Sequence, residues 1–185
     1  MYANGVANET QVASASASNI FKLSMIDALV EKAKTNTPKI RPLRINGKDK
    51  YVMFLHPYQV TDLRQNTSTG QWLDIVKAMY QQSKEMNPIY QGGLGEYNGV
   101  ILHESTRVPA GLVAGVYRAI FLGAQAGVVA FGQKTVANRP NWYEELFDYG
   151  NQLGVSAGMI WGAKKTVFNS TDFGTIVLST YAAAH

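Results

Sequence analysis

One stretch of the chain decides its expected fold: residues 50–64, KYVMFLHPYQVTDLR. Its first part, Tyr51–His56, is rich in β-branched and aromatic residues and favours a strand. His56-Pro57 ends that strand, because proline has no N–H to donate to a sheet. Apolar residues then follow at helical spacing, at Val60 and Leu63. The stretch predicts a strand followed directly by a short helix.

A second β-favouring run, Ile40–Ile45, precedes this strand across the pair Asn46-Gly47. Asn-Gly is a strong signal for a two-residue hairpin turn, since both residues tolerate positive φ. We therefore expect a hairpin over about 39–56. Pro42 predicts that the first strand lies at an edge or carries a bulge.

The segment before the hairpin predicts an amphipathic helix over about 19–35. Its apolar residues follow the i, i+3, i+4 rule, and lysines gather in its last turns, where they favour the helix dipole. Residues 1–18 are small and polar, which predicts a disordered leader. The apolar positions of the helix are Ile20, Leu23, Ile26, Leu29, Val30 and Ala33.

The chain after the hairpin alternates helical and extended patterns. A second helix is expected from about Trp72, with apolar positions up to Tyr80, and is closed by Asn87-Pro88. Gly123–Phe131 is interpreted as a small-residue helix or turn. The stretch from Trp142 to Val177 mixes aromatic, glycine and β-branched residues, and its pattern does not divide it into separate helices and strands. Strands are expected at Val100–Leu102, Arg118–Leu122 and Ile176–Tyr181, so the predicted class is α+β.

Positive charge is concentrated in the first third of the chain. Residues 1–64 hold nine lysines and arginines against five acidic residues, whereas residues 65–185 hold eight of each. Residues 32–50 hold seven of these lysines and arginines against a single acidic residue, Asp49. This run could contact phosphate or an acidic partner or could form an ordinary solvated surface. The candidate contact residues for DNA or a subunit are Lys39, Arg41, Arg44, Lys48 and Lys50.

Motifs for catalysis and cofactor binding are weak. The chain has no cysteine, which excludes disulfides and thiolate chemistry, and its three histidines have no ligand partner at helical spacing. The glycine-rich segment 92–99 lacks the order of a phosphate-binding loop. The acidic trio Glu144, Glu145 and Asp148 could resemble a carbohydrate site, although an exposed acidic strip is the simpler interpretation. We therefore expect no enzyme activity, no cofactor, no bound metal and no membrane segment.

Residues 50–64 resemble the core signature of major capsid proteins of tailed bacteriophages, in particular those of podophages that carry a large virion RNA polymerase. Further blocks of the resemblance follow in the same order, over about residues 20–181. They are Gly70–Ile75, Asn87–Ile89, Gly93–Val100, His103–Ser105, Arg107–Pro109 and Phe147–Gly150.

The resemblance implies the Hong Kong 97-type capsid fold. It would make the helix at about 19–35 the spine helix and the hairpin at 39–56 part of the peripheral β-sheet domain. Residues 57–140 would form the axial α/β domain, and residues 141–181 would return to the peripheral domain, so that 19–185 is a capsid core.

The function implied is that of a structural subunit that self-assembles into hexamers and pentamers of an icosahedral shell around DNA. Its expected partners are copies of itself, other virion proteins and packaged DNA bound non-specifically. Such a protein is made in the bacterial cytoplasm and resides in the virion. Members of this family carry an N-terminal arm and an extended loop before the spine helix, and only about 18 residues precede that helix here. We therefore expect a folded chain that fails to close shells.

Two other functions stay open from the sequence. The first is a nucleic-acid-binding module that uses residues 32–50, which strongly salt-dependent DNA binding would reveal. The second is a carbohydrate-active enzyme built on Glu144, Glu145 and Asp148, which would lose hydrolysis when these residues are changed.

Overall fold

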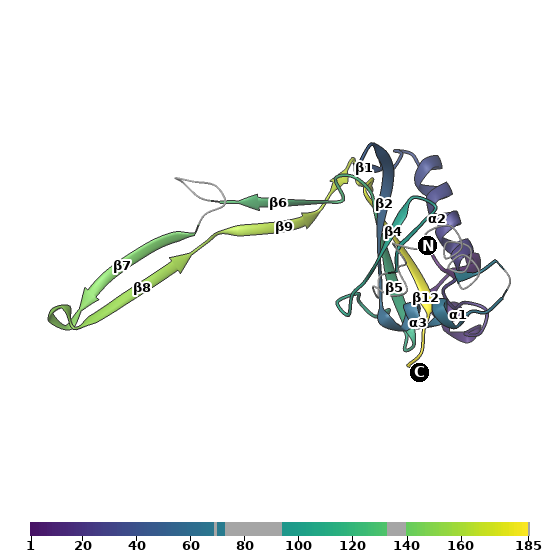
Figure 1. The fold of residues 1–185 in the computed structure, drawn as a ribbon, viewed down its shortest axis with the longest axis horizontal. Coiled ribbons are helices and arrows are strands. Elements are labelled where there is room, and N and C mark those ends of the chain that lie inside the picture. Colours follow the sequence, from purple (N-terminus) through teal and green to yellow (C-terminus); the bar gives the residue numbers. More distant parts are fainter. Residues whose placement is uncertain (69, 73–93, 133–139, 185) are drawn as a thin grey trace, which may run out of the picture.

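The computed structural model describes residues 1–68, 70–72, 94–132 and 140–184. It consists of an α+β core and a long two-stranded ribbon that projects from one end of it (Figure 1). The α+β class predicted from the sequence is therefore confirmed. The helix expected between about Trp72 and Asn87-Pro88 falls, apart from its start, outside the described residues.

The core is built on a six-stranded sheet in the order β12-β5-β2-β4-β3, with β1 beside the start of β2. β2 and β4 run parallel, and the other pairs are antiparallel. Strands from three distant parts of the chain therefore share one sheet. The division of the chain into a peripheral domain and an axial domain stays a prediction. The strands are β1 (Leu43–Ile45), β2 (Lys48–Leu55), β3 (Glu96–Tyr97), β4 (Val100–Glu104), β5 (Val116–Leu122) and β12 (Thr175–Tyr181).

A row of apolar side chains crosses the sheet on one face. Ile176 lies opposite Phe121, Phe121 lies opposite Met53, and Met53 lies opposite Leu102. All four are buried and belong to a single hydrophobic core. Because side chains alternate between the faces of a strand, this register places Tyr51 and Leu55 of β2 and Ala119 of β5 on the same buried face.

Helix α2 (Leu23–Thr35) supplies the second layer of the core. It begins at Leu23, later than expected, because Ile20 forms an isolated bridge with Tyr181 of β12 and leaves the chain extended there. The helix was otherwise predicted correctly. Its buried residues are Leu23, Met25, Ile26, Leu29, Val30 and Ala33.

The predicted hairpin and the helix after it are confirmed. Asn46 and Gly47 both adopt positive φ between β1 and β2, as a tight turn requires. Helix α3 (Pro57–Gln65) begins directly after β2 and is capped by His56, whose Nδ1 accepts a hydrogen bond from the N–H of Tyr58. The Gln59 side chain accepts a hydrogen bond from the His56 N–H in return, which completes the cap.

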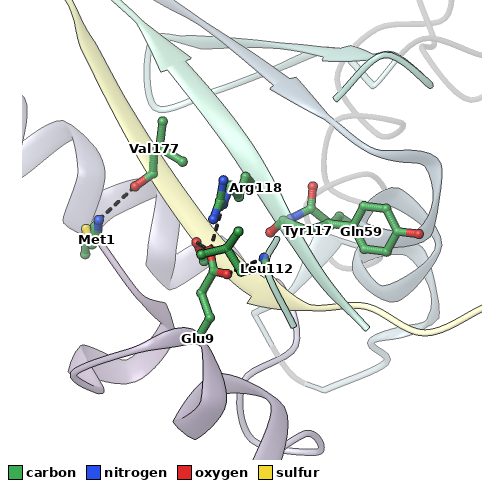
Figure 2. A network of polar contacts seen from close by, with 8 residues as sticks. Met1, Glu9, Gln59, Leu112, Tyr117, Arg118 and Val177 are labelled. Carbon is green, nitrogen blue, oxygen red and sulfur yellow. Dashed lines mark hydrogen bonds and ion pairs between the residues drawn. The ribbon is translucent and has the colours of Figure 1, made fainter. Parts of the chain in front are cut away.

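The first eighteen residues are folded, which corrects the expectation of a disordered leader. They form a 3₁₀ turn, η1 (Ala3–Gly5), and helix α1 (Glu9–Ser14). Figure 2 shows how Glu9 holds them on the sheet: its carboxylate accepts hydrogen bonds from Arg118 Nε at 2.7 Å and from the Leu112 N–H at 2.6 Å. The polar composition was misleading because the buried Glu9 carboxylate, which has several donors, anchors the segment together with the fully buried side chains of Ala3 and Val12.

The electrostatics of Glu9 follow from these contacts. The hydrogen bond from Arg118 is the main reason that the pKa of Glu9 lies below its ordinary value of 4.5; burial opposes this shift, and bonds from Leu112 and Ser179 support it. The N-terminal amine donates to the carbonyl of Val177 at 2.8 Å (Figure 2), which adds a second attachment to β12. The folded N-terminal segment is therefore stabilised by the ionised form of Glu9.

We predict that Glu9→Gln destabilises the protein by about 2 kcal/mol at pH 7, the scale of hydrogen bonds to a charged group. Because the folded pKa of Glu9 is lowered, its contribution is complete above about pH 4.5 and is lost as the pH falls through the folded value. Urea unfolding of both proteins at pH 7 and near pH 3 measures this, and the difference between them should shrink at low pH. Glu31→Gln, on the exposed face of α2, is the matched control; a difference independent of pH would contradict the assignment.

The segment Gly123–Phe131, interpreted as a helix or turn, forms a turn only at Ala124 and Gln125. From Gly127 to Phe131 it is a strand at the start of the projecting ribbon, so the interpretation is wrong for that part. Its residues include strand-favouring Val128, Val129 and Phe131, which pair with a distant strand. The ribbon consists of two antiparallel pairs separated on one side by Met159 and Ile160. The pair next to the core is β6 (Gly127–Phe131) with β9 (Trp161–Lys165). The distal pair is β7 (Asn141–Phe147) with β8 (Gln152–Gly158), and η2 (Asp148–Gly150) joins these two strands at the tip of the ribbon.

A short hairpin of β10 (Val167–Phe168) and β11 (Thr171–Asp172) connects the ribbon back to β12. Within the described ranges, no helix has the length and apolar character needed to cross a membrane.

Candidate functional site

The ribbon, whose projection from the core is seen in Figure 1, exposes large apolar side chains along its length. Two-stranded ribbons are at best marginally stable alone in water, and contiguous exposed apolar patches mark interaction sites. The ribbon is therefore the first candidate functional surface. Its exposed large apolar residues are Val128, Val129, Phe131, Trp142, Tyr143, Leu146, Phe147, Tyr149, Leu153, Val155, Met159, Ile160 and Trp161.

The distal half of the ribbon, β7 with β8, has two different faces. Leu146 lies directly opposite Leu153, and Val155 lies on the same face two positions along. Leu146 and Leu153 are 65% and 62% exposed, although leucines of folded proteins are usually buried. Trp142 shares this face and donates from its indole N–H to Glu144 at 2.5 Å. We call this surface, formed by Trp142, Leu146, Leu153 and Val155 with the carboxylate of Glu144, the ribbon face.

The root of the ribbon is fastened to the core by backbone contacts. The N–H of Ala124 donates to the carbonyl of Arg41 at 2.7 Å, and that of Gly123 donates to Gly174 at 2.8 Å. A side chain at Gly174 would meet the backbone of Ala126 at 2.7 Å, so glycine permits this close approach. The ribbon therefore leaves the core at a defined place, beside the segment that precedes β1.

The structure separates the five candidate basic residues into different environments. Lys39 and Arg41 precede β1, and the Arg41 guanidinium donates to Gln125 Oε1 at 2.9 Å at the ribbon root. Lys50 is paired with Glu96, which neutralises its charge. Arg44 and Lys48 lie on the exposed β1–β2 hairpin, where Arg44 forms a solvent-exposed ion pair with Asp49 that contributes little.

Lys39 and Arg41 share a groove of about 510 Å³ with Lys34, from the end of α2. Its apolar wall includes Ile40 and Tyr51, and the Tyr51 hydroxyl donates to the carbonyl of Ile40 at 3.1 Å. The sequence placed all the basic residues in one run, and the fold selects these three cations for one concave surface. We call it the root groove; Val30, Pro42, Asp49, Asn98 and Gly99 complete its lining.

The residues considered for catalysis have structural roles or lie apart. His56 caps α3 and stacks on Tyr117, with ring centroids 4.1 Å apart. Burial lowers the pKa of His56, against a smaller opposing effect of Glu104, so the neutral ring that accepts the Tyr58 N–H is favoured at neutral pH. His103 stacks on Phe54 at the end of β4, with centroids 5.5 Å apart.

The acidic trio lies at the far end of the ribbon. Glu144 and Glu145 are successive residues of β7 and therefore point to opposite faces, and Asp148 lies in the tip turn. All three are exposed, an arrangement that does not hold carboxylates across a cleft. Among the described residues, no group of three or more histidine, aspartate or glutamate side chains could hold a metal ion.

The ribbon is the feature that sequence reasoning missed. Its strands alternate weakly because apolar residues occupy both faces, as in Trp142 and Tyr143, so no period-two pattern emerges. The available signal was the density of aromatic and β-branched residues between glycines in 142–177, together with the turn-favouring Asp148-Tyr149-Gly150.

A folded core bearing a long apolar ribbon and a basic groove defines a protein that functions by association with other macromolecules. Comparison with known proteins identifies the class. The sequence profile of the family described as phage capsid protein matches residues 1–184. The chain therefore belongs to the phage capsid protein family, which is a family of structural virion proteins and not of enzymes.

Individual relatives agree with this assignment. The chain is 30% identical over 173 residues to the major capsid protein of Pseudomonas phage KPP25, covering 83% of this chain and 43% of that protein. It is similar to the capsid of Ralstonia phage GP4, with 33% identity, a TM-score of 0.71 and coverage of 100% of this chain and 52% of the other. The chain thus spans about half of the length of the relatives that it matches.

More distant structures show the fold alone. The capsid asymmetric unit of cyanophage Pam1 matches with a TM-score of 0.70 at 22% identity, over 91% of this chain and 48% of the other. The head structure of Helicobacter pylori bacteriophage KHP40 matches with a TM-score of 0.60 at 12% identity, over 87% and 58%. The expected Hong Kong 97-type fold is confirmed by these matches together.

We predict that Leu146→Ser combined with Leu153→Ser leaves the melting temperature of the core nearly unchanged, because both side chains are exposed. The same change should reduce binding of a hydrophobic dye and lower any self-association. Calorimetry and dye fluorescence measure the first two effects, and sedimentation velocity measures the third. Leu112→Ser, an exposed leucine of the core, is the control; unchanged dye binding in the double variant would contradict the role of the ribbon face.

Proposed function

We propose that this chain is a shell-building part of a phage major capsid protein and that it works by packing against copies of itself in the virion. Membership of the phage capsid protein family supports this. The single observation that carries it is the exposed apolar ribbon, which needs a partner surface to be removed from water.

Finer features of the proposal rest on the resemblance. The shell would contain hexamers and pentamers around DNA, with other virion proteins and non-specifically bound DNA as further partners. The signature at residues 50–64 supports a place among podophages that carry a virion RNA polymerase. The resemblance also supports α2 as the spine helix, although its thirteen residues make it short for that role.

The chain should self-associate reversibly into small oligomers without forming closed shells. The ribbon supplies an exposed apolar contact surface, so copies should associate. A contact made by one two-stranded ribbon is expected to bury less than roughly 1,000 Å², and interfaces of that size are usually weak or transient. Sedimentation velocity across a wide range of concentrations measures the oligomers, and negative-stain microscopy detects shells. A strict monomer at every concentration would contradict the proposal, and closed particles tens of nanometres across would contradict the expected failure to close.

A second candidate function, non-specific DNA binding, is favoured by the three cations of the root groove. If phosphates occupy this groove, the affinity for duplex DNA should fall steeply with salt, since each neutralised phosphate releases counterions. Fluorescence anisotropy with labelled duplex at several salt concentrations measures the slope. Changing the three groove cations Lys34, Lys39 and Arg41 together to Gln should flatten it without unfolding the chain; an unchanged slope would exclude this surface as the DNA contact.

A further inference from the structure

We propose that Asn46, in the turn between β1 and β2, is a site of spontaneous covalent modification, at which the side-chain amide is lost and the residue becomes aspartate or isoaspartate. The chain has three Asn-Gly pairs, which begin at Asn4, Asn46 and Asn98. Glycine after asparagine permits this reaction, because no side chain shields the next backbone nitrogen from close approach. The three pairs are alike in sequence, and their contacts in the folded chain single out Asn46.

The reaction needs only the chain itself and water. The backbone nitrogen of Gly47, once its N–H has lost a proton, attacks the side-chain carbonyl carbon of Asn46. A C–N bond forms there, and the side-chain nitrogen takes up a proton and leaves as ammonia, so that a five-membered succinimide results. Water then opens the ring at one of its two carbonyl groups. One opening gives aspartate, and the other gives isoaspartate, in which the main chain continues through the side-chain carbon; neither step is a redox step.

The amide of Asn46 is free to react. Asn46 and Gly47 are both exposed, and both adopt positive φ. Within the part of the chain that the structure describes, neither the Asn46 side chain nor the Gly47 N–H has a hydrogen-bond partner. The next residue, Lys48, is an exposed cation that forms no ion pair with any described residue. A nearby positive charge favours the deprotonated nitrogen that begins the attack.

The amide of Asn98 is held in place. Its Nδ2 donates to a carboxylate oxygen of Asp27 at 2.8 Å, and the same carboxylate accepts a hydrogen bond from the Tyr97 hydroxyl at 3.1 Å. The carbonyl of Gly99 accepts a hydrogen bond from the Tyr51 N–H at 2.8 Å, which fixes the backbone after Asn98. The negative charge of Asp27 also disfavours a deprotonated nitrogen beside it. Asn98 is therefore protected twice, by its contacts and by its electrostatic surroundings.

The amide of Asn4 is held by the end of the N-terminal segment. Its Nδ2 donates to the carbonyl of Ser18 at 2.7 Å and to Asn19 Oδ1 at 3.0 Å. The attacking nitrogen is occupied as well, because the Gly5 N–H donates to the carbonyl of Tyr2 at 3.3 Å. All three asparagines are exposed, so these hydrogen bonds, and not burial, distinguish the protected pairs from the free one.

The β1–β2 turn is also weakly held, which matters because the attack requires the turn to open. β1 is only three residues long, and its middle residue, Arg44, is exposed. The ion pair of Arg44 with Asp49, at 3.5 Å, is exposed and contributes little to holding the turn closed. Exposed ends of a sheet with few buried contacts open most easily.

The two products differ in their effect on the hairpin. Asp-Gly favours the same two-residue turn as Asn-Gly, so aspartate preserves it. Isoaspartate adds a methylene group to the main chain, and the lengthened turn no longer matches the register that pairs Ile45 with Lys48. Either product replaces a neutral amide with a carboxylate and lowers the net charge of +4 by one unit at neutral pH.

Peptide mapping by mass spectrometry, on protein incubated at mildly alkaline pH, measures the reaction at each site. Asn46 should react about tenfold or more faster than Asn98, because freeing the Asn98 amide breaks a hydrogen bond to a charged group. Asp27→Ala should accelerate Asn98 and leave Asn46 unchanged. Glu31→Ala, which removes another exposed carboxylate of α2, is the matched control and should change neither rate. In urea, where the folded contacts are absent, all three sites should react at similar rates.

Equal rates at Asn46 and Asn98 in the folded protein would refute the proposal. The same ranking in urea would also refute it, because local sequence and not the folded structure would then set the rates. An Asp27→Ala variant in which Asn98 stays slow would refute the protection by that carboxylate. Ion exchange isolates the modified protein by its lower charge. Asn46→Asp should melt close to the wild type and the isoaspartate form at a lower temperature; equal melting temperatures would refute the effect on the hairpin.

Discussion

The structure depends on the burial of one face of β2. This strand is paired along its length with β1, β4 and β5, and its inward residues Tyr51, Met53 and Leu55 lie in the core beneath α2. Because side chains alternate along a strand, a shift of one residue would turn this whole set outward. The burial of the β2 face therefore fixes the register of the neighbouring strands and, through β5 and β12, the place where the ribbon leaves the core.

That place has a functional consequence. The same segment that leads from α2 into β1 accepts the backbone bond from Ala124 and contributes Lys39 and Arg41 to the root groove. The ribbon root and the groove are thus built from adjacent pieces of backbone, so their relative position is rigid. Every copy of the chain therefore presents the exposed apolar ribbon and the basic groove in the same relative position.

Buried and half-buried polar groups in this protein organise the fold. Glu9 attaches the N-terminal segment to β5 and β12, His56 caps α3, and Gln59 donates from α3 to Thr180 Oγ1 and to the Tyr117 carbonyl. Each satisfies backbone or side-chain partners that would otherwise be unpaired in the interior. His56, which the sequence alone left open as a catalytic candidate, therefore has a structural role. This agrees with membership of a family of structural proteins.

The sequence by itself determined the local elements: the Asn46-Gly47 hairpin, the helix over most of 19–35, the His56-Pro57 boundary and the strands around Val100, Arg118 and Ile176. These depend on turn chemistry and on periodicity within a few residues, which single-sequence reasoning can evaluate. Only the tertiary structure decided that residues 1–18 are folded, that 127–131 and 141–165 form a ribbon, and which cations share a groove. Glu9 meets Arg118 across 109 residues, and Val128 pairs with Lys164, so these outcomes depend on partners that only the folded chain brings together.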